Sequence, residues 1–122
     1  MNPEQVVRQF CTAVETQGPK QLAGYFTEDA VYHNIPLDPV KGRAAIEATL
    51  TQFVGANGGG EFQILALATT GSKVMTERID RLEMGGKKIE IPVMGIFEVA
   101  PDGKISAWRD YFDMQQVVKQ MS

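Results

Sequence analysis

The chain has 122 residues, of which 43% are hydrophobic and 22% are charged, and its formal net charge at pH 7 is −3. Residues 1–122 fit a single globular domain, and the slightly acidic balance excludes the basic surface that a nucleic-acid partner would need. The single cysteine, Cys11, excludes an intramolecular disulfide.

The first residues predict a helix rather than a targeting segment. Asn2-Pro3 is typical of a helix N-cap followed by the first helical residue, and the apolar stretch of a signal peptide is not found there. No run of the sequence approaches the roughly 18 apolar residues that span a membrane. We therefore expect a cytoplasmic protein without a membrane partner.

Helical spacing dominates the first half of the chain. Apolar residues at helical intervals follow Pro3 as far as Gln17, where Gly18-Pro19 ends the pattern, and a second apolar stripe begins at Arg43. The predicted elements are helices over 3–17, 20–26 and 43–53, an extended segment over 30–35, and a loop over 55–60.

After residue 60 the hydrophobic period changes to two. This alternation predicts four strands and a final short helix, over 61–70, 73–84, 87–100, 104–113 and from Met114. Glycine-rich pairs and Pro101-Asp102-Gly103 separate the strands with residues typical of hairpin turns. Helices followed by an antiparallel meander predict an α+β domain in which the N-terminal helices cover one face of the sheet.

Turn geometry predicts the strand register. A two-residue turn at Gly85-Gly86 places Arg78 opposite Val93 and Asp80 opposite Ile91. A two- or four-residue connection after the next strand places Val93 opposite Asp110, whereas a three-residue connection turns Asp110 to the other face. Pro92, inside a predicted central strand, indicates a bulge.

On this register the two faces of the sheet differ in character. The face that must lie under the helices is mostly apolar, and we expect five of its residues to line a substrate pocket: Leu65, Leu82, Val93, Trp108 and Phe112. The opposite face carries more apolar residues than a monomer usually exposes, which predicts a homodimer. Those residues are Phe62, Ile64, Met75, Ile79, Met94, Ile96 and Tyr111.

Arg78, Asp80 and Asp110 stand among the apolar residues of the covered face. Isolated buried charges are costly, but one arginine can bridge two carboxylates with its planar fork. One arginine and two aspartates leave a net charge of −1, which a proton retained on one carboxyl removes. The prediction is a neutral acid beside an ionised base in a dry pocket, which suits general acid–base catalysis.

Tyr32 and Asn34 share a face because they are two residues apart on an extended segment. A phenol and an amide can each hold a water molecule without ionising. His33 between them points the other way, and with Cys11 distant in sequence it provides no ligand set. We therefore expect no metal and no cofactor.

At these residues the chain resembles a known family. Tyr32-His33-Asn34, Arg78-Ile79-Asp80 and Trp108-Arg109-Asp110-Tyr111-Phe112-Asp113 are similar, in order and spacing, to the active-site motifs of limonene-1,2-epoxide hydrolases. The resemblance covers nearly the whole chain. It implies a cone-shaped curved sheet wrapped by helices, shared with ketosteroid isomerase, nuclear transport factor 2 and SnoaL-like polyketide cyclases. It also implies a homodimer that adds water to a small apolar epoxide, without a cofactor.

The same resemblance implies a role for each polar residue. Asp110 would deprotonate a water held by Tyr32 and Asn34, Asp80 would protonate the epoxide oxygen, and Arg78 would bridge the two carboxylates. Two alternatives stay open. A ketosteroid-isomerase-like or polyketide-cyclase-like enzyme would need one dominant base and an oxyanion donor. A non-catalytic binding module of the nuclear transport factor type would not need three buried charges.

Overall fold

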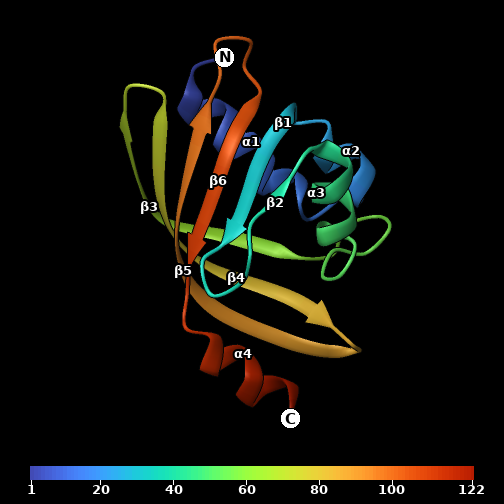
Figure 1. The fold of residues 1–122 in the computed structure, drawn as a ribbon. Helices are drawn as coiled ribbons and strands as arrows, with labels where there is room; N and C mark the ends of the chain where they lie inside the picture. The colour runs from blue at the N-terminus through green and yellow to red at the C-terminus, as the bar shows by residue number, and fades with distance from the viewer.

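The computed structural model describes all 122 residues and contains four helices and six strands (Figure 1). In chain order they are α1 (Pro3–Ala13), α2 (Pro19–Ala23), β1 (Phe26–Asn34), β2 (Val40–Lys41), α3 (Arg43–Leu50), β3 (Glu61–Thr70), β4 (Lys73–Met84), β5 (Lys87–Val99), β6 (Ile105–Tyr111) and α4 (Met114–Met121). No helix has the length and hydropathy required to cross a membrane.

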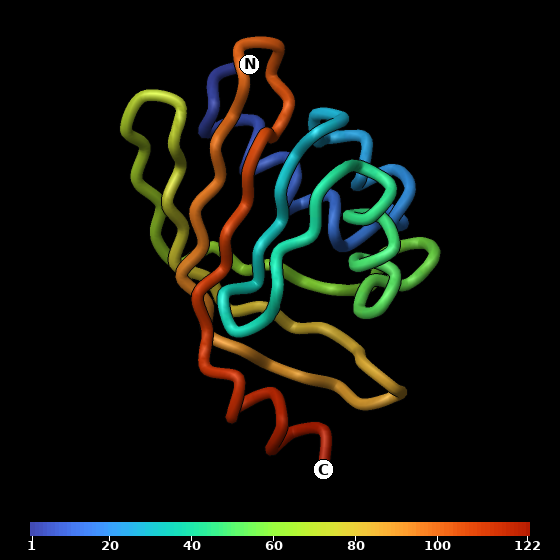
Figure 2. Tube along the Cα trace, viewed as in Figure 1, coloured from blue at the N-terminus to red at the C-terminus, as the bar shows by residue number.

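The six strands form one curved sheet in the order β2-β1-β6-β5-β4-β3. Figure 2 shows the chain of β4 and β5 bending strongly along its length, so the sheet wraps partly around the helices without closing. Helix α1 contacts β3, β4 and β5, and α3 contacts β1 and β2. The α+β prediction is confirmed, with one correction: β1 runs parallel to β6, so the sheet is mixed rather than purely antiparallel.

The predicted elements are present, but several ends differ. Helix α1 has the predicted Asn2 cap, whose side chain accepts a hydrogen bond from the Gln5 backbone, yet it ends at Ala13 rather than Gln17. Helix α3 ends at Leu50 rather than Phe53, and β1 begins at Phe26, where it pairs with Ile105. The two-residue strand β2 was not predicted.

The register around the Gly85-Gly86 turn is confirmed, with Arg78 opposite Val93 and Asp80 opposite Ile91. The predicted pairing of Val93 with Asp110 is wrong, because Asp110 lies opposite Gly95. The connection has three residues, 101–103, because Ala100 pairs with Lys104, and this length alone would turn Asp110 to the outer face. A one-residue shift in register between Glu98 and Val99 returns Asp110 to the inner face.

The bulge predicted at Pro92 is also absent. Pro92 pairs in register with Ile79, and the pairing of β5 with β6 begins only at Met94. A strand segment with a free side tolerates a residue that lacks a backbone N–H, so proline fits here without a bulge.

Strand β3 does contain a bulge, between Ile64 and Ala66, and it corrects two predictions. Before the bulge, Phe62 lies opposite Asp80 and Ile64 opposite Arg78, so both point inward rather than to the outer face. Leu65 occupies the bulge and is 52% exposed. It therefore does not line the pocket, because one extra residue reverses the alternation of side chains.

The main core is rich in aromatic rings. Trp108 is completely buried, stacks on Tyr32 with ring centroids 4.0 Å apart, and contacts Phe97 and Phe10. Trp108 thus belongs to the core and does not line the cavity, contrary to prediction. A second, smaller apolar cluster, which we call the β5–α4 cluster, contains Ile89, Ile91, Val93 and Val117.

Candidate active site

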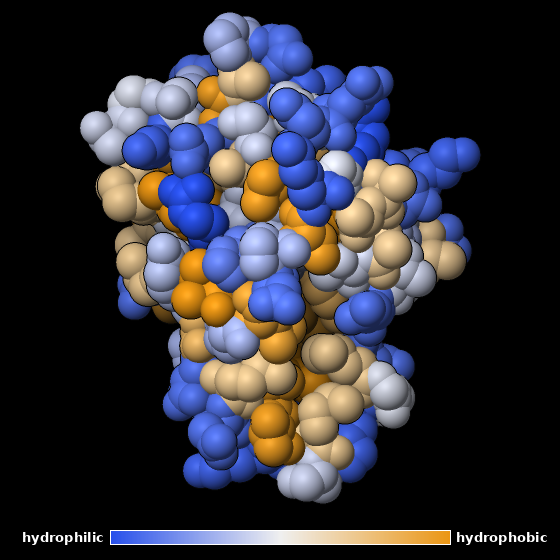
Figure 3. Space-filling model, viewed as in Figure 1, coloured by the Kyte–Doolittle hydropathy of each residue, from blue (hydrophilic) through white to orange (hydrophobic).

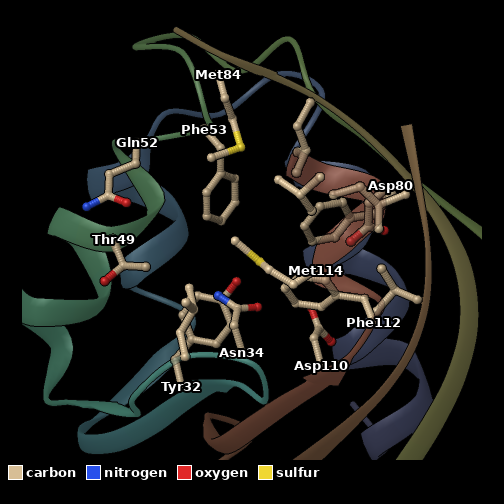
Figure 4. Close-up of a pocket in the computed structure, with 16 residues that line it drawn as sticks. Tyr32, Asn34, Thr49, Gln52, Phe53, Asp80, Met84, Asp110, Phe112 and Met114 are labelled. Atoms are coloured by element: carbon tan, nitrogen blue, oxygen red, sulfur yellow. The ribbon is translucent and has the colours of Figure 1, made fainter. Parts of the chain in front are cut away.

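A cavity of about 110 Å³ opens between the inner face of the sheet, α3 and α4 (Figure 4). Seven residues predicted for the site line it: Tyr32, Asn34, Asp80, Leu82, Val93, Asp110 and Phe112. The other lining residues are Leu37, Thr49, Gln52, Phe53, Phe62, Met84, Ile91, Met114 and Val117. The structure therefore brings both carboxylates to one wall of a mainly apolar cavity.

Arg78 lies behind those two carboxylates and is fully buried. Its Nε donates to Asp80 Oδ1 at 2.9 Å and its Nη2 donates to Asp80 Oδ2 at 2.8 Å, a two-pronged ion pair. The same Nη2 donates to Asp110 Oδ2, also at 2.8 Å. The guanidinium thus fixes the two carboxylates relative to one another through charge-assisted bonds.

Two residues that were not predicted complete this network. The Thr76 hydroxyl accepts from Arg78 Nη1 at 3.0 Å and donates to the Gly95 carbonyl at 3.0 Å. Gly95 lies on β5, between the strands that carry Asp80 and Asp110, and its missing side chain leaves the space that the network fills. A glycine inside a strand is the one sequence signal that could have indicated this close approach.

Asp110 has a second donor on its other oxygen. The Trp108 indole N–H donates to Asp110 Oδ1 at 2.7 Å, from two residues earlier on β6. The role of Trp108 is therefore to orient this carboxylate from within the core. The rings of Phe62 and Phe97 lie 4.8 Å and 5.7 Å from the guanidinium carbon of Arg78, within range of cation–π attraction.

Parallel pairing brings Tyr32 and Asn34 to the same wall. Tyr32 is the register partner of Trp108, and Asn34 is that of Asp110. Their side chains line the cavity beside the Asp110 carboxylate, as Figure 4 shows. Burial, and then the nearby Asp110 charge, raise the pKa of Tyr32 well above its ordinary value, so this phenol stays neutral and can offer a hydrogen bond.

The electrostatics favour a proton on one carboxyl. Burial raises the pKa of Asp80 to about 6, against the opposing attraction of the Arg78 guanidinium. Burial alone would lower the pKa of Arg78, but Asp110 and Asp80 outweigh it and raise that pKa, so Arg78 stays charged. A carboxyl that holds its proton close to neutral pH can act as an acid.

The lone histidine and cysteine lie outside this arrangement. His33 Nε2 lies 2.9 Å from the Leu37 carbonyl. Burial raises the pKa of Cys11 to about 12, which keeps it an inert thiol. No group of three His, Cys, Asp or Glu side chains is arranged to hold a metal ion.

The structure thus combines a curved sheet with a buried Asp–Arg–Asp network on the wall of a mainly apolar cavity. Residues 1–122 match the family described as the limonene-1,2-epoxide hydrolase catalytic domain, and the chain belongs to that family. It is 33% identical over 113 residues to epoxide hydrolase EphG of Mycobacterium tuberculosis, covering 93% of this chain and 74% of that protein. Both findings support epoxide hydrolase activity in general.

Solved structures agree on the fold. A limonene-epoxide-hydrolase-like epoxide hydrolase from M. tuberculosis superposes with a TM-score of 0.75 at 26% identity, over 96% of this chain and 90% of that one. The epoxide hydrolase/cyclase-like enzyme SalBIII superposes with a TM-score of 0.82 at 18% identity, over 93% and 92% of the two chains. At that lower identity the likeness concerns the fold alone.

Proposed function

We propose that this protein hydrolyses a small apolar epoxide to a vicinal diol in one step, with water as the nucleophile and without a covalent intermediate. The observation that carries the proposal is the single guanidinium nitrogen of Arg78, which binds Asp80 Oδ2 and Asp110 Oδ2 at 2.8 Å each. This arrangement holds one acid and one base on the same cavity wall, as simultaneous protonation and deprotonation require.

In the proposed step, Asp110 takes a proton from a water molecule held by Tyr32 and Asn34. The water oxygen forms a bond to one epoxide carbon while the bond from that carbon to the ring oxygen breaks. Asp80 donates its proton to the departing oxygen. Water thus becomes a stronger nucleophile and the epoxide oxygen a better leaving group in the same step. Each proton transfer of this kind typically contributes about 10²–10⁴-fold in rate.

The charge of the site supports this assignment. With Asp80 protonated, Arg78 and Asp110 carry +1 and −1, so the buried network is neutral before the reaction. Afterwards Asp110 holds the proton and Asp80 carries the negative charge, so the network is neutral again. No net charge has to be created in the apolar cavity, where it would be expensive. Return of one proton from Asp110 to Asp80 completes the cycle.

The main alternatives fit this geometry less well. An isomerase or cyclase that depends on one dominant base needs an oxyanion donor opposite it, not a second carboxyl matched through an arginine. A binding module would gain nothing from three charges that are each at most 4% exposed. Epoxides of the limonene type are one candidate substrate among small cyclic, terpene and aliphatic epoxides.

The proposal is tested by assaying diol formation from a panel of such epoxides. Asp80→Asn and Asp110→Asn should each lose nearly all activity, while Asp38→Asn, at an exposed loop position, serves as the matched control. Either active-site variant retaining more than roughly a tenth of the wild-type rate would contradict the acid–base assignment. Prolonged dialysis against a chelator should leave the rate unchanged, because the proposed step needs no metal.

We also propose a homodimer through the outer face of the sheet. Met94 and Tyr111 are register partners there and are 53% and 50% exposed, beside Met75 and Ile96. Figure 3 shows hydrophobic residues on this side of the molecule interspersed with hydrophilic ones. We propose that a second copy of the chain covers this face of the sheet. The cytoplasmic location expected from the sequence stays a prediction.

A further inference from the structure

The cavity lies at a boundary between two apolar clusters. On one side are residues of, or packed against, the main core, including Tyr32, Phe53 and Phe62. On the other side are Val117 and Met114 of α4, which belong to or pack against the β5–α4 cluster. The α4 side of the cavity wall therefore belongs to a cluster separate from the main core.

Helix α4 is attached to the rest of the protein mainly through β5. It lies apart from α1, α2 and α3, beside the bent ends of β4 and β5 (Figure 1). Val117 is its only buried residue, whereas Val118 is 50% exposed. Little buried apolar area therefore holds the helix in place, which is typical of segments that open locally at low cost.

The side chain of Gln120 joins α4 to the backbone of β5 through hydrogen bonds. Its Oε1 accepts from the Glu90 backbone N–H at 2.7 Å, and its Nε2 donates to the Glu90 carbonyl at 2.9 Å and to the Gln116 carbonyl at 2.8 Å. Glu90 lies on the segment of β5 that has no strand beyond it, because β6 pairs only from Met94 onward. The Gln120 amide thus takes the place of a neighbouring strand's backbone.

We propose that Gln120 is a positioning residue that, through its bonds to Glu90, fixes α4 as the movable wall of the substrate cavity and so limits substrate size. This inference rests on the proposed function. The wall closes when both bonds form, bringing Met114 and Val117 toward Asp80 and Asp110. A small epoxide contacts α4 only when this wall is closed. A bulky epoxide fits into the cavity only when α4 is displaced outward.

The test compares Gln120→Ala with Gln116→Ala, an exposed glutamine on the same helix, by two measurements. Amide hydrogen exchange of residues 117–121 should accelerate at least about fivefold in Gln120→Ala, because the two hydrogen bonds to Glu90 and the one to Gln116 are lost. The ratio of kcat/KM for limonene oxide to that for cyclohexene oxide should rise by at least about fivefold. Gln116→Ala should behave as the wild type in both measurements.

An isosteric variant separates hydrogen bonding from side-chain volume. Gln120→Glu keeps the size and the acceptor for the Glu90 N–H, but its carboxylate cannot donate to the Glu90 carbonyl. It should therefore resemble Gln120→Ala. Unchanged exchange in both variants, or an unchanged substrate ratio despite faster exchange, overturns the proposal. If the wild type converts neither epoxide, the proposed function fails, while the exchange data still decide whether Gln120 fastens α4.

Discussion

Gly95 lies directly opposite Asp110 in the ladder between β5 and β6, and its α-carbon faces the carboxylate. A β-carbon at this position would collide with Asp110 Oδ1 and with Arg78 Nη1. These two atoms belong to the network that fixes the Asp80 and Asp110 carboxylates relative to one another. The absence of a side chain at Gly95 is therefore necessary for the observed positions of Asp110 and Arg78.

Replacing Gly95 by alanine should therefore disable the enzyme. Asp110 and Arg78 must shift to admit the methyl group, and overpacking of this kind typically costs about 1–3 kcal/mol of stability. We expect a loss of diol formation of at least roughly a hundredfold, since small misplacements at a reacting centre can have this effect. Steady-state kinetics and thermal unfolding provide the measurement, with Gly24→Ala, at a helical φ of −65°, as the control.

Activity should depend on pH through Asp80. Its pKa is raised to about 6 by burial, so the protonated form that donates to the epoxide decreases about tenfold for each pH unit above that value. We expect kcat/KM to fall on the alkaline side with an apparent pKa close to 6. A profile that stays flat from pH 5 to pH 8 would contradict the role of Asp80 as the acid.

The stability of the protein should change with pH in the opposite sense to that produced by an aspartate whose pKa is lowered on folding by an ion pair. Between the ordinary pKa of 3.8 and the raised value of about 6, the folded protein holds a proton on Asp80 that the unfolded chain has lost. The contribution of Asp80 to stability is therefore lost as pH rises through this window and is constant above it. Asp80→Asn should abolish this component, which is measured as the difference between the two proteins' unfolding free energies at pH 4 and pH 7.

The covered face of the sheet was predictable because side-chain alternation is a local property. Arg78 and Asp80 follow from strand phase alone. The face of Asp110 depended on the length of the connection, and a register shift that the sequence does not signal offset the three-residue turn. Leu65 was misplaced because a bulge has no distinct signal in an apolar strand, and one extra residue reverses the phase. Strands β1 and β6 are far apart in the sequence, so local sequence patterns could not predict that they pair or that they run parallel.

The contacts that orient the network were also beyond prediction. Trp108 was assigned to the pocket because it shares a face with Asp110, but only three-dimensional packing shows its ring in the core and its N–H on the carboxylate. Thr76 lies on the same face of β4 as Arg78, yet nothing in its sequence position distinguishes a hydroxyl that binds a guanidinium from a half-buried strand residue. Such roles depend on distances rather than on periodicity.

The proposed dimer is tested on the exposed partners Met94 and Tyr111. Met94→Glu places a charge in the centre of the outer apolar patch, where burial against a second copy would be costly. Sedimentation should show a dimer for the wild type at micromolar concentration and a 13.4 kDa monomer for this variant. Val118→Glu, an equally exposed apolar position on α4, is the control and should leave the dimer intact. A monomeric wild type would exclude the proposed interface.

The one-step mechanism makes a prediction about the origin of the new hydroxyl oxygen. Many epoxide hydrolases attack the ring with an aspartate and then hydrolyse the resulting ester. Here all four carboxylate oxygens accept hydrogen bonds, those of Asp80 from Arg78 and those of Asp110 from Arg78 and the Trp108 indole, which disfavours movement of either carboxylate toward carbon. His33, the only histidine, faces the Leu37 carbonyl and is not placed to activate water for ester hydrolysis.

A single turnover with enzyme in excess, carried out in ¹⁸O-water, separates these routes. If water attacks carbon directly, the first diol formed should already contain one ¹⁸O atom. If a carboxylate attacks, its own unlabelled oxygen passes to the diol in that first turnover, and the label appears on the aspartate instead. Mass spectrometry of the diol and of the peptides that contain Asp80 and Asp110 distinguishes the outcomes. Unlabelled first-turnover diol, or an alkyl ester on either residue, would show that the two carboxyl groups do more than transfer protons.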